Sequence, residues 1–315
     1  MRGMRAPRIL LCARAPAKVN LVLRVGARRR DGYHDLDTLM VPLDLADDVR
    51  VEIRRGCPGA VACRVPDRPD LDGPSNLAAR AAEAFRRRYV TTDRVEITIQ
   101  KRIPVTAGLG GGSSDAATVL RALARAYQVR DPEGLLAAGL QVGSDVPFFL
   151  GRGPAWATGR GERLTPAEVP TLDLVVLYPR DPSVSIRAAD AYRWLDASRQ
   201  SPASRLPLDA RARARWTPSA AVNDLEGPCL ARHPRLAELE ACLVGHGATA
   251  AIMSGSGPAV FGVFPDRTAA RRAARGAREM GLEADVHVVR TLMRHPGVSR
   301  WKSPRSACSP STRRS

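Results

Sequence analysis

The 315-residue sequence contains only three lysines, Lys18, Lys101 and Lys302, although lysine and arginine together number 49. A lysine retained in so arginine-rich a chain is expected where the planar arginine fork does not fit. This scarcity favours a specific role for Lys18. Aromatic residues make up only 4% of the chain, which leaves few side chains on which nucleic-acid bases could stack.

Metal-binding and membrane-spanning patterns are also missing. The six cysteines form no C-x-x-C pair and have no histidines at metal-ligand spacing, so we predict neither a zinc site nor a disulfide framework. No apolar run reaches the roughly 18 residues of a membrane helix, and the apolar part of RILLCARAPAK is too short for a signal peptide. We therefore expect a cytoplasmic protein with no membrane partner.

Acidic residues are scarce in the C-terminal part of the chain, where positive charge is concentrated. The net charge is +17, and the residues from Arg290 onward supply seven positive charges and no negative one. A solvated basic surface with a basic tail accounts for this pattern, and a positive field also suits small anionic substrates. We expect no nucleic-acid partner, and a basic nucleic-acid-binding protein stays open as the alternative from a different class.

Hydrophobic periodicity and turn signals predict two α+β domains, over residues 1–165 and 166–293, followed by a disordered basic tail over 294–315. Residues 197–218 are arginine-rich and are predicted to form a long loop near the substrate entrance. The predicted strands are 19–25, 37–45, 47–53, 94–101, 172–179 and 283–289, with a strand, glycine turn and strand over 248–264. The predicted helices are 75–89, capped by Ser75 or Asn76, and 113–129, 132–142, 186–196, 223–230, 234–247 and 266–281.

A glycine-rich stretch, PVTAGLGGGSSDAATVL, stands between the strand over 94–101 and the next helix. A helix N-terminus offers unpaired N–H groups, and glycines before it let the backbone wrap around a phosphate. No Gly-Lys-Ser/Thr follows, so it is not a Walker loop, and Ser113 breaks the dinucleotide fingerprint. A plain structural turn is the alternative reading. The residues predicted to bind ATP are Pro104, Val105, Thr106, Ala107, Gly108, Leu109, Gly110, Gly111, Gly112, Ser113 and Ser114.

This stretch resembles the phosphate-binding motif of the GHMP superfamily, the galactokinases, homoserine kinases, mevalonate kinases and phosphomevalonate kinases. APAKVNL (15–21) is similar to the first motif of that superfamily, and MSGSGPAVFGVF (253–264) to the last. The three motifs occur in the expected order and cover nearly the whole folded chain. The resemblance implies an N-terminal domain like domain 2 of ribosomal protein S5 and a ferredoxin-like C-terminal domain.

Further motifs narrow the resemblance within the superfamily. APAKVNL followed by RRDGYHDLDT, GSDVPFF and NDLE is most similar to members that phosphorylate a cytidine-diphosphate-linked methylerythritol in the non-mevalonate route to isoprenoids. The implied reaction is phosphoryl transfer from ATP, with Mg²⁺, to a tertiary hydroxyl. Another alcohol such as homoserine or a mevalonate derivative is the rival acceptor, but the DGYH turn argues against it. Thr106 stands where a glycine or alanine is commoner.

The resemblance assigns two catalytic residues. Asp145 is the candidate general base, because phosphoryl transfer needs a carboxylate to accept the hydroxyl proton. Asp145 also precedes Val-Pro, so a helix cap is the alternative reading. An ammonium from Lys18 would keep that carboxylate ionised and help orient the hydroxyl; a surface lysine at a strand edge is its alternative.

Four residues are candidate substrate ligands. The resemblance implies that Tyr33 and His34 hold cytosine by stacking and by hydrogen bonds, with Tyr192 on the other face of the base. Local packing is the alternative for these three. Asn20, two positions after Lys18 on the same strand face, is expected to contact the substrate.

Several neighbouring residues complete the predicted site. Gly255, Ser256 and Gly257 are expected to bring backbone N–H groups toward the phosphates, a simple β-turn being the alternative. Ser113 and Ser114 have hydroxyls suited to phosphate or Mg²⁺, and no metal ligand is assigned. Asp115 is expected to stabilise the first helical turn. Lys101 is expected to be a surface lysine at a strand end, and steering of phosphate is its alternative role.

Overall fold

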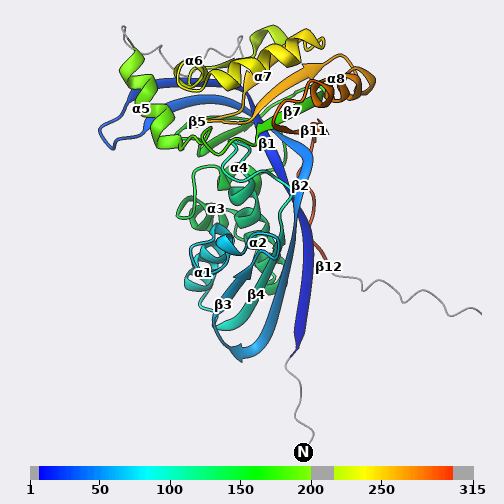
Figure 1. Cartoon of the computed structure of the whole chain (residues 1–315). Helices are drawn as coiled ribbons and strands as arrows, with labels where there is room; N and C mark the ends of the chain where they lie inside the picture. The colour runs from blue at the N-terminus through cyan, green and yellow to red at the C-terminus, as the bar shows by residue number, and fades with distance from the viewer. Residues whose placement is uncertain (1–6, 200–215, 301–315) are drawn as a thin grey trace, which may run out of the picture.

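Two β-sheets, each covered by helices, organise the part of the chain described by this computed structural model, residues 7–199 and 216–300. Figure 1 shows the larger sheet with the N-terminal helices against one face, and the smaller sheet with the C-terminal helices at the other end of the molecule. The expected α+β class is confirmed.

The larger sheet is built on two long antiparallel strands, of 21 and 25 residues, which run along the molecule (Figure 1). The sequence predicted separate strands over 37–45 and 47–53, but they form one strand because both halves pair with the same partner. Within the described residues the order is β12-β1-β2-β4-β3, with β5 joining β2 to β6 and β8 beside β1. The strands are β1 (Arg8–Arg28), β2 (His34–Pro58), β3 (Val61–Arg64), β4 (Asp93–Gln100), β5 (Ala155–Gly159), β6 (Arg163–Pro166), β8 (Val222–Asn223) and β12 (Ser299–Arg300).

The larger sheet buries its apolar face under four helices: α1 (Leu77–Tyr89), α2 (Gly111–Tyr127), α3 (Pro132–Leu140) and α4 (Val146–Leu150). Asn76 is the residue that caps α1, since its side chain accepts a hydrogen bond from the backbone N–H of Ala78. Phe85, Phe148 and Phe149 are completely buried between these helices and the sheet. The core therefore fixes both the start of α2 and the start of α4, where site residues were predicted.

The smaller sheet has the strand order β11-β7-β10-β9, all antiparallel. Counted along the chain, the spatial order is fourth, first, third, second, with helices after the first and third strands, which is the expected ferredoxin-like arrangement. Its elements are β7 (Asp173–Pro179), α5 (Ala188–Ser198), α6 (Glu226–Leu230), α7 (Pro234–Gly245), β9 (Ala250–Met253), β10 (Val260–Phe264), α8 (Arg267–Glu279) and β11 (Ala284–Arg290), and two short 3₁₀ helices cover Pro69–Leu71 and Pro218–Ala220.

The middle of the long β1–β2 pair joins the two sheets. Val19 and Leu21 of β1 are fully buried and belong to one apolar cluster with Leu174 of β7 and Phe261 of β10. The predicted domain boundary after residue 165 falls at the end of β6 and stays a prediction, since β1 and β2 pack in both halves. This shared core fixes the start of the chain against the glycine turn between β9 and β10.

The predicted disordered tail begins too early. Residues 294–300 are ordered: the His295 N–H donates to the Arg152 carbonyl, and β12 pairs with Leu11 and Cys12 of β1. The prediction is wrong here because the basic segment gains backbone partners along the larger sheet, which composition alone does not reveal. Residues 301–315, including Lys302, lie outside the described residues, as does most of the predicted 197–218 loop.

Candidate active site

The first motif places Lys18 and Asn20 side by side on β1. The pairing of β1 with β2 shifts register between Pro16 and Lys18 and again after Asn20, and such irregularities re-aim side chains beside active sites. The Lys18 ammonium donates a 2.6 Å hydrogen bond to Asn20 Oδ1, and Asn20 Nδ2 donates a 2.7 Å bond to Thr38 Oγ1. Lys18 and Asn20 are both 4% exposed. Their side chains are therefore held in one orientation.

Asp145 approaches this pair from the residue just before α4. Its Oδ2 lies 3.6 Å from Lys18 Nζ, and its side chain is 39% exposed. Asp145 occupies the N-cap position of α4, but its side chain makes no capping hydrogen bond. The carboxylate thus faces Lys18 and the neighbouring cavity, which is the arrangement needed for the catalytic interpretation.

The glycine-rich stretch forms a tight loop that ends at the first residue of α2. Gly108 and Gly110 have φ angles of +76° and +70°, which favour glycine. A Cβ on Gly108 would lie 2.1 Å from the backbone oxygen of Ser254, so only glycine fits this close approach. Thr106 also has a positive φ, +55°, which is strained for a β-branched residue.

The turn between β9 and β10 packs directly against this loop. The Ala259 N–H donates to the Ala107 carbonyl, and the Ser254 hydroxyl donates to the Gly108 carbonyl. Asn223, from the NDLE motif, holds the turn by donating 2.8 Å hydrogen bonds from Nδ2 to the carbonyls of both Met253 and Gly255. Sequence reasoning used NDLE for the resemblance but did not assign Asn223 a site role. Its buried amide, 5% exposed, becomes informative only once the turn is seen.

Two cavities meet at the glycine loop. The larger, about 900 Å³, is lined by Lys18, Asn20, Tyr33, His34, Asp145, Tyr192, Gly255 and Ser256 among others. The smaller, about 380 Å³, is lined by most of the predicted ATP-binding residues, including Pro104, Val105, Thr106, Ala107, Gly111 and Gly112. Gly108, Gly110 and Ser113 line both. A ligand in one cavity can therefore reach a ligand in the other across the loop.

Three predicted residues do not line these cavities. The Leu109 side chain is buried in the core, although its carbonyl accepts the Lys18 N–H. Ser114 is fully buried, and its hydroxyl has no hydrogen-bond partner. Gly257 shapes the turn instead, with φ +76° and no room for a Cβ beside the Met253 sulfur.

The far end of the larger cavity is aromatic and basic. Tyr33 is 49% exposed, and the Arg160 guanidinium lies over its ring at 3.7 Å from the centroid. The His34 and Tyr192 rings stack on each other, 5.2 Å apart with a 20° interplanar angle, so no base lies between these two. Burial raises the pKa of Tyr192, which keeps its phenol neutral. Arg160 and Asp196, which contacts His34, are site residues that sequence reasoning missed, because each acts through an aromatic partner brought close only by folding.

Lys101 is not a surface lysine. Its side chain is only 10% exposed, and its ammonium lies 2.5 Å from Asp47 Oδ2 and 2.9 Å from Asp115 Oδ2. Asp47 Oδ1 also accepts the N–H groups of Arg102 and Ile103, just before the glycine loop. Asp115 lies past the first turn of α2, so its predicted role there is wrong. Burial raises the pKa of Asp115 to about 8, against the attraction of the Lys101 ammonium.

No group of three or more His, Cys, Asp or Glu side chains in residues 7–199 and 216–300 is arranged to hold a metal ion. Cys12, Cys57, Cys63, Cys229 and Cys242 are free thiols. None of the helices in this part of the chain has the length and apolar character to span a bilayer.

Comparison with known proteins decides the family. The models of the GHMP kinases N terminal domain and of the GHMP kinases C terminal domain match residues 76–153 and 209–282. The chain is 65% identical over 307 residues to a 4-diphosphocytidyl-2-C-methyl-D-erythritol kinase of Anaeromyxobacter dehalogenans, covering 96% of this chain and 97% of that one. The chain belongs to the 4-diphosphocytidyl-2-C-methyl-D-erythritol kinase family of GHMP kinases. Like other GHMP kinases, it is an ATP-dependent phosphotransferase.

More distant kinases agree with this assignment. A 4-diphosphocytidyl-2-C-methyl-D-erythritol kinase of Citrifermentans bemidjiense is 40% identical, with 82% of this chain and 91% of that one covered. A crystal structure of 4-(cytidine 5'-diphospho)-2C-methyl-D-erythritol kinase superposes with a TM-score of 0.71 at 38% identity, covering 89% of this chain and 99% of the other. Homoserine kinase from Cytophaga hutchinsonii, at 16% identity and a TM-score of 0.68 with 95% and 99% covered, shares the fold.

Proposed function

We propose that this kinase transfers the γ-phosphoryl group of ATP to the 2-hydroxyl of 4-(cytidine 5'-diphospho)-2-C-methyl-D-erythritol, a step of the non-mevalonate isoprenoid pathway in the cytoplasm. One observation carries the proposal: the Lys18–Asp145 pair lines the larger cavity where it meets the smaller one at Gly108 and Gly110. A phosphoryl donor and an acceptor hydroxyl bound in the two cavities would meet beside a carboxylate.

In this proposal ATP occupies the smaller cavity. Its phosphates would lie against the loop at Gly108–Gly112 and the N-terminus of α2, where backbone N–H groups and the helix dipole favour an anion. Ser113 lines both cavities, and its hydroxyl would donate to the phosphate being transferred. Preformed donors of this kind stabilise the charge that develops during transfer.

Mg²⁺ would accompany the nucleotide. The residues at the junction suit it, since the partly exposed Asp145 carboxylate adds a negative charge nearby while its oxygens stay available to the acceptor hydroxyl. With no larger cluster of acidic groups among the described residues, the ion would be held chiefly by ATP phosphates and water. When bound, it would neutralise phosphate charge.

Asp145 accepts the proton of the acceptor hydroxyl in this proposal, which makes the oxygen a better nucleophile. Lys18 stabilises the ionised carboxylate, and its short hydrogen bond goes to Asn20, so the Asp145 oxygens stay available to the hydroxyl. Asn20 is itself held by Thr38 and lines the cavity, where its amide would contact the methylerythritol.

The cytidine end of the substrate would occupy the aromatic end of the larger cavity, with Tyr33, His34 and Tyr192 around the base. Arg28, Arg160, Arg187 and Arg193 line the same cavity, and their guanidinium groups suit a diphosphate. Homoserine and mevalonate have neither a base nor a diphosphate for these groups.

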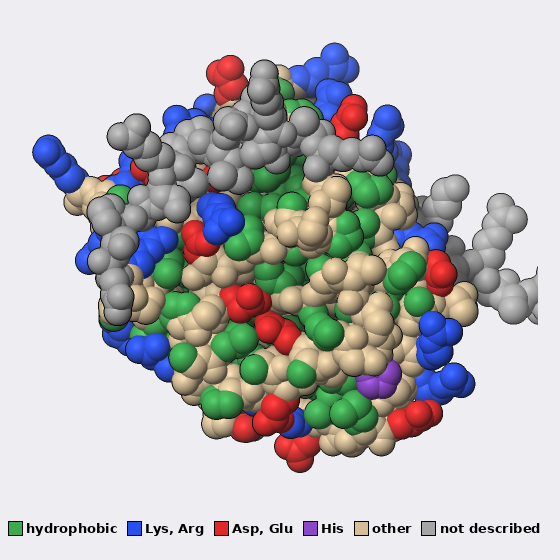
Figure 2. All heavy atoms as spheres, turned by 90° about the horizontal axis from the view of Figure 1, so that it is seen from above, with side chains coloured by type: hydrophobic (Ala, Val, Ile, Leu, Met, Phe, Trp, Pro, Cys, Tyr) green, Lys and Arg blue, Asp and Glu red, His purple; other side chains and the backbone are tan. Residues whose placement is uncertain are grey.

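The face of the molecule seen in Figure 2 carries its Lys and Arg side chains mostly around the edge, without a continuous basic patch for a nucleic acid.

The test is ADP release by the purified full chain with Mg-ATP and each acceptor in turn: the cytidine-linked substrate, homoserine and mevalonate. We expect turnover with the cytidine-linked substrate alone and its loss in Asp145→Asn. Turnover with homoserine or mevalonate instead would contradict the proposed acceptor. Undiminished turnover in Asp145→Asn would remove Asp145 from the mechanism.

A further inference from the structure

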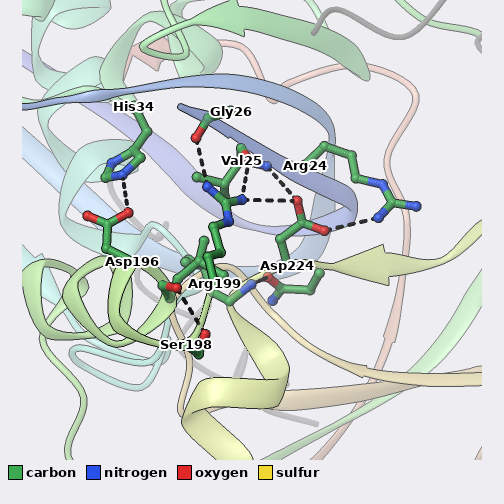
Figure 3. Close-up of polar contacts among 11 residues, drawn as sticks. Arg24, Val25, Gly26, His34, Asp196, Ser198, Arg199 and Asp224 are labelled. Atoms are coloured by element: carbon green, nitrogen blue, oxygen red, sulfur yellow. Dashed lines mark hydrogen bonds and ion pairs between the residues drawn. The ribbon is translucent and has the colours of Figure 1, made fainter. Parts of the chain in front are cut away.

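Asp196, on α5, contacts the histidine at the start of β2. Its Oδ1 lies 2.8 Å from His34 Nε2, and the His34 side chain is only 5% exposed (Figure 3). Both residues line the larger cavity. An ionised carboxylate can only accept hydrogen bonds, so the imidazole must carry a hydrogen on Nε2. In the neutral ring, Nδ1 is then a hydrogen-bond acceptor.

The His34 ring is also fixed in orientation. Tyr192 stacks on it, and Tyr192 and Asp196 are four residues apart, on the same side of α5. One face of α5 therefore holds the imidazole in two ways. Tyr192 stacks on the ring plane, and Asp196 accepts the Nε2 hydrogen. The contact with the carboxylate decides which ring nitrogen carries the proton.

The end of α5 is anchored to β1, so Asp196 is held in place. Arg199 donates hydrogen bonds to the carbonyls of Val25 and Gly26, and its guanidinium lies 3.9 Å from Asp224 (Figure 3). Asp224 accepts the Val25 N–H at 2.8 Å and pairs with Arg24 at 3.0 Å. These contacts join the end of α5, which carries Asp196, to β1, the strand before the turn that leads into His34.

We infer that Asp196 is a positioning residue that makes this kinase select cytosine over uracil, by holding His34 as the tautomer whose Nδ1 accepts a hydrogen bond. The inference rests on the proposed function. Cytosine has an amino group at position 4, which can donate to Nδ1. Uracil has a carbonyl there, so two acceptors would face each other in a largely buried site and neither would have a partner. Switching the tautomer for uracil would place the Nε2 lone pair against the Asp196 carboxylate.

The decisive variant is Asp196→Asn. An asparagine amide can accept from or donate to Nε2, so it keeps the contact between α5 and His34 but no longer imposes a tautomer. A purely structural tether predicts that Asp196→Asn behaves as the wild type. Tautomer control predicts that Asp196→Asn and Asp196→Ala lose selectivity alike.

The kinetic test compares kcat/KM for the cytidine-linked substrate and its uridine-linked analogue at pH 8, with saturating Mg-ATP. We expect the wild type to prefer cytidine by about 100-fold or more, and both Asp196 variants to lower that ratio about tenfold or more with KM for ATP unchanged. Asp190→Asn is the matched control, because Asp190 is another α5 carboxylate in this cavity but pairs with Arg187 and Arg193. A wild-type ratio in Asp196→Asn would overturn the inference, whereas no turnover of the cytidine-linked substrate by the wild type would instead contradict the proposed function.

A second readout is independent of activity. Ring ¹⁵N chemical shifts of the histidine-labelled full chain distinguish a protonated from an unprotonated nitrogen, with His34 assigned by its loss in His34→Gln. We expect His34 to be protonated on Nε2 alone in the wild type, and to show both tautomers in Asp196→Asn. A wild-type His34 protonated on Nδ1 would overturn the inference whatever the substrate is.

Discussion

The Lys18 ammonium lies 3.6 Å from the Asp145 carboxylate, just beyond a hydrogen bond, and gives its short hydrogen bond to Asn20. The carboxylate thus lies beside a cation and keeps its capacity to accept hydrogen bonds. Lys18 is almost fully buried, whereas Asp145 is partly open to the larger cavity. The pair can therefore supply a fixed positive charge on one side and a proton acceptor on the other.

This relationship predicts a catalytic defect without a folding defect. Asp145→Asn keeps the shape of the side chain and removes the proton acceptor, so kcat should fall by about 10²–10⁴-fold. Lys18→Met should lower kcat to a similar extent, because the carboxylate loses the neighbouring cation. Steady-state ADP release measures both. Thermal unfolding is the control: a large drop in Tm alongside the lost activity would mean that the pair is structural.

The close approach of Gly108 to Ser254 predicts that Gly108→Ala disrupts the nucleotide loop. The added methyl would meet the Ser254 oxygen, and φ +76° is unfavourable for alanine by about 1–2 kcal/mol. KM for ATP should rise about tenfold or more. Gly227→Ala is the control, since its Cβ would meet nothing within 4 Å and Gly227 lines neither cavity. Equal ATP KM values for the two variants would show that the contact between the loops is unimportant.

The buried Lys101 ammonium predicts a large loss of stability in Lys101→Met. Asp47 and Asp115 would then share a buried site without a cation, a change that costs about 3–5 kcal/mol of unfolding free energy. Urea denaturation followed by circular dichroism gives the value. Arg102→Ala removes the neighbouring exposed pair with Asp48 and should cost about 1 kcal/mol or less. A similar, small effect of both substitutions would contradict the buried-pair interpretation.

Glu240 on α7 predicts a pH-dependent stability. Burial, together with the nearby Glu226 carboxylate, raises the pKa of Glu240 to about 9 from an ordinary 4.5. Between these values the folded chain binds a proton that the unfolded chain has released, so stability should fall as pH rises from about 5 to 9. Glu240→Gln keeps a donor for Glu226, which accepts the Met253 N–H, and abolishes the titration. Its Tm at pH 8 should exceed the wild-type value by roughly 2–4 °C. At pH 5 the two should agree, and an equal difference at both pH values would contradict the assignment.

Local patterns were sufficient for most elements. The apolar spacing over 75–89 and 113–129 predicted α1 and α2 to within two residues, because helix periodicity and capping are properties of neighbouring residues. The predicted tail failed at residues 294–300, since its order depends on β1, which lies far away in sequence. The prediction of a surface position for Lys101 was wrong for the same reason. A lysine at a strand end is usually exposed, and only the tertiary structure brings Asp47 and Asp115 close to it.

The sequence by itself determined the three family motifs, and it predicted the phosphate loop and the catalytic pair, because each depends on which residues stand next to one another or on a resemblance carried by them. The tertiary structure alone decided that Ser254 contacts the loop, that Asn223 holds the neighbouring β9–β10 turn, and that His34 is held by Asp196. These contacts join segments that approach only when the β1–β2 core packs against both sheets. The sequence was enough to name the candidate site residues. The orientation of their side chains and the position of the His34 proton depend on partner residues that only folding brings close.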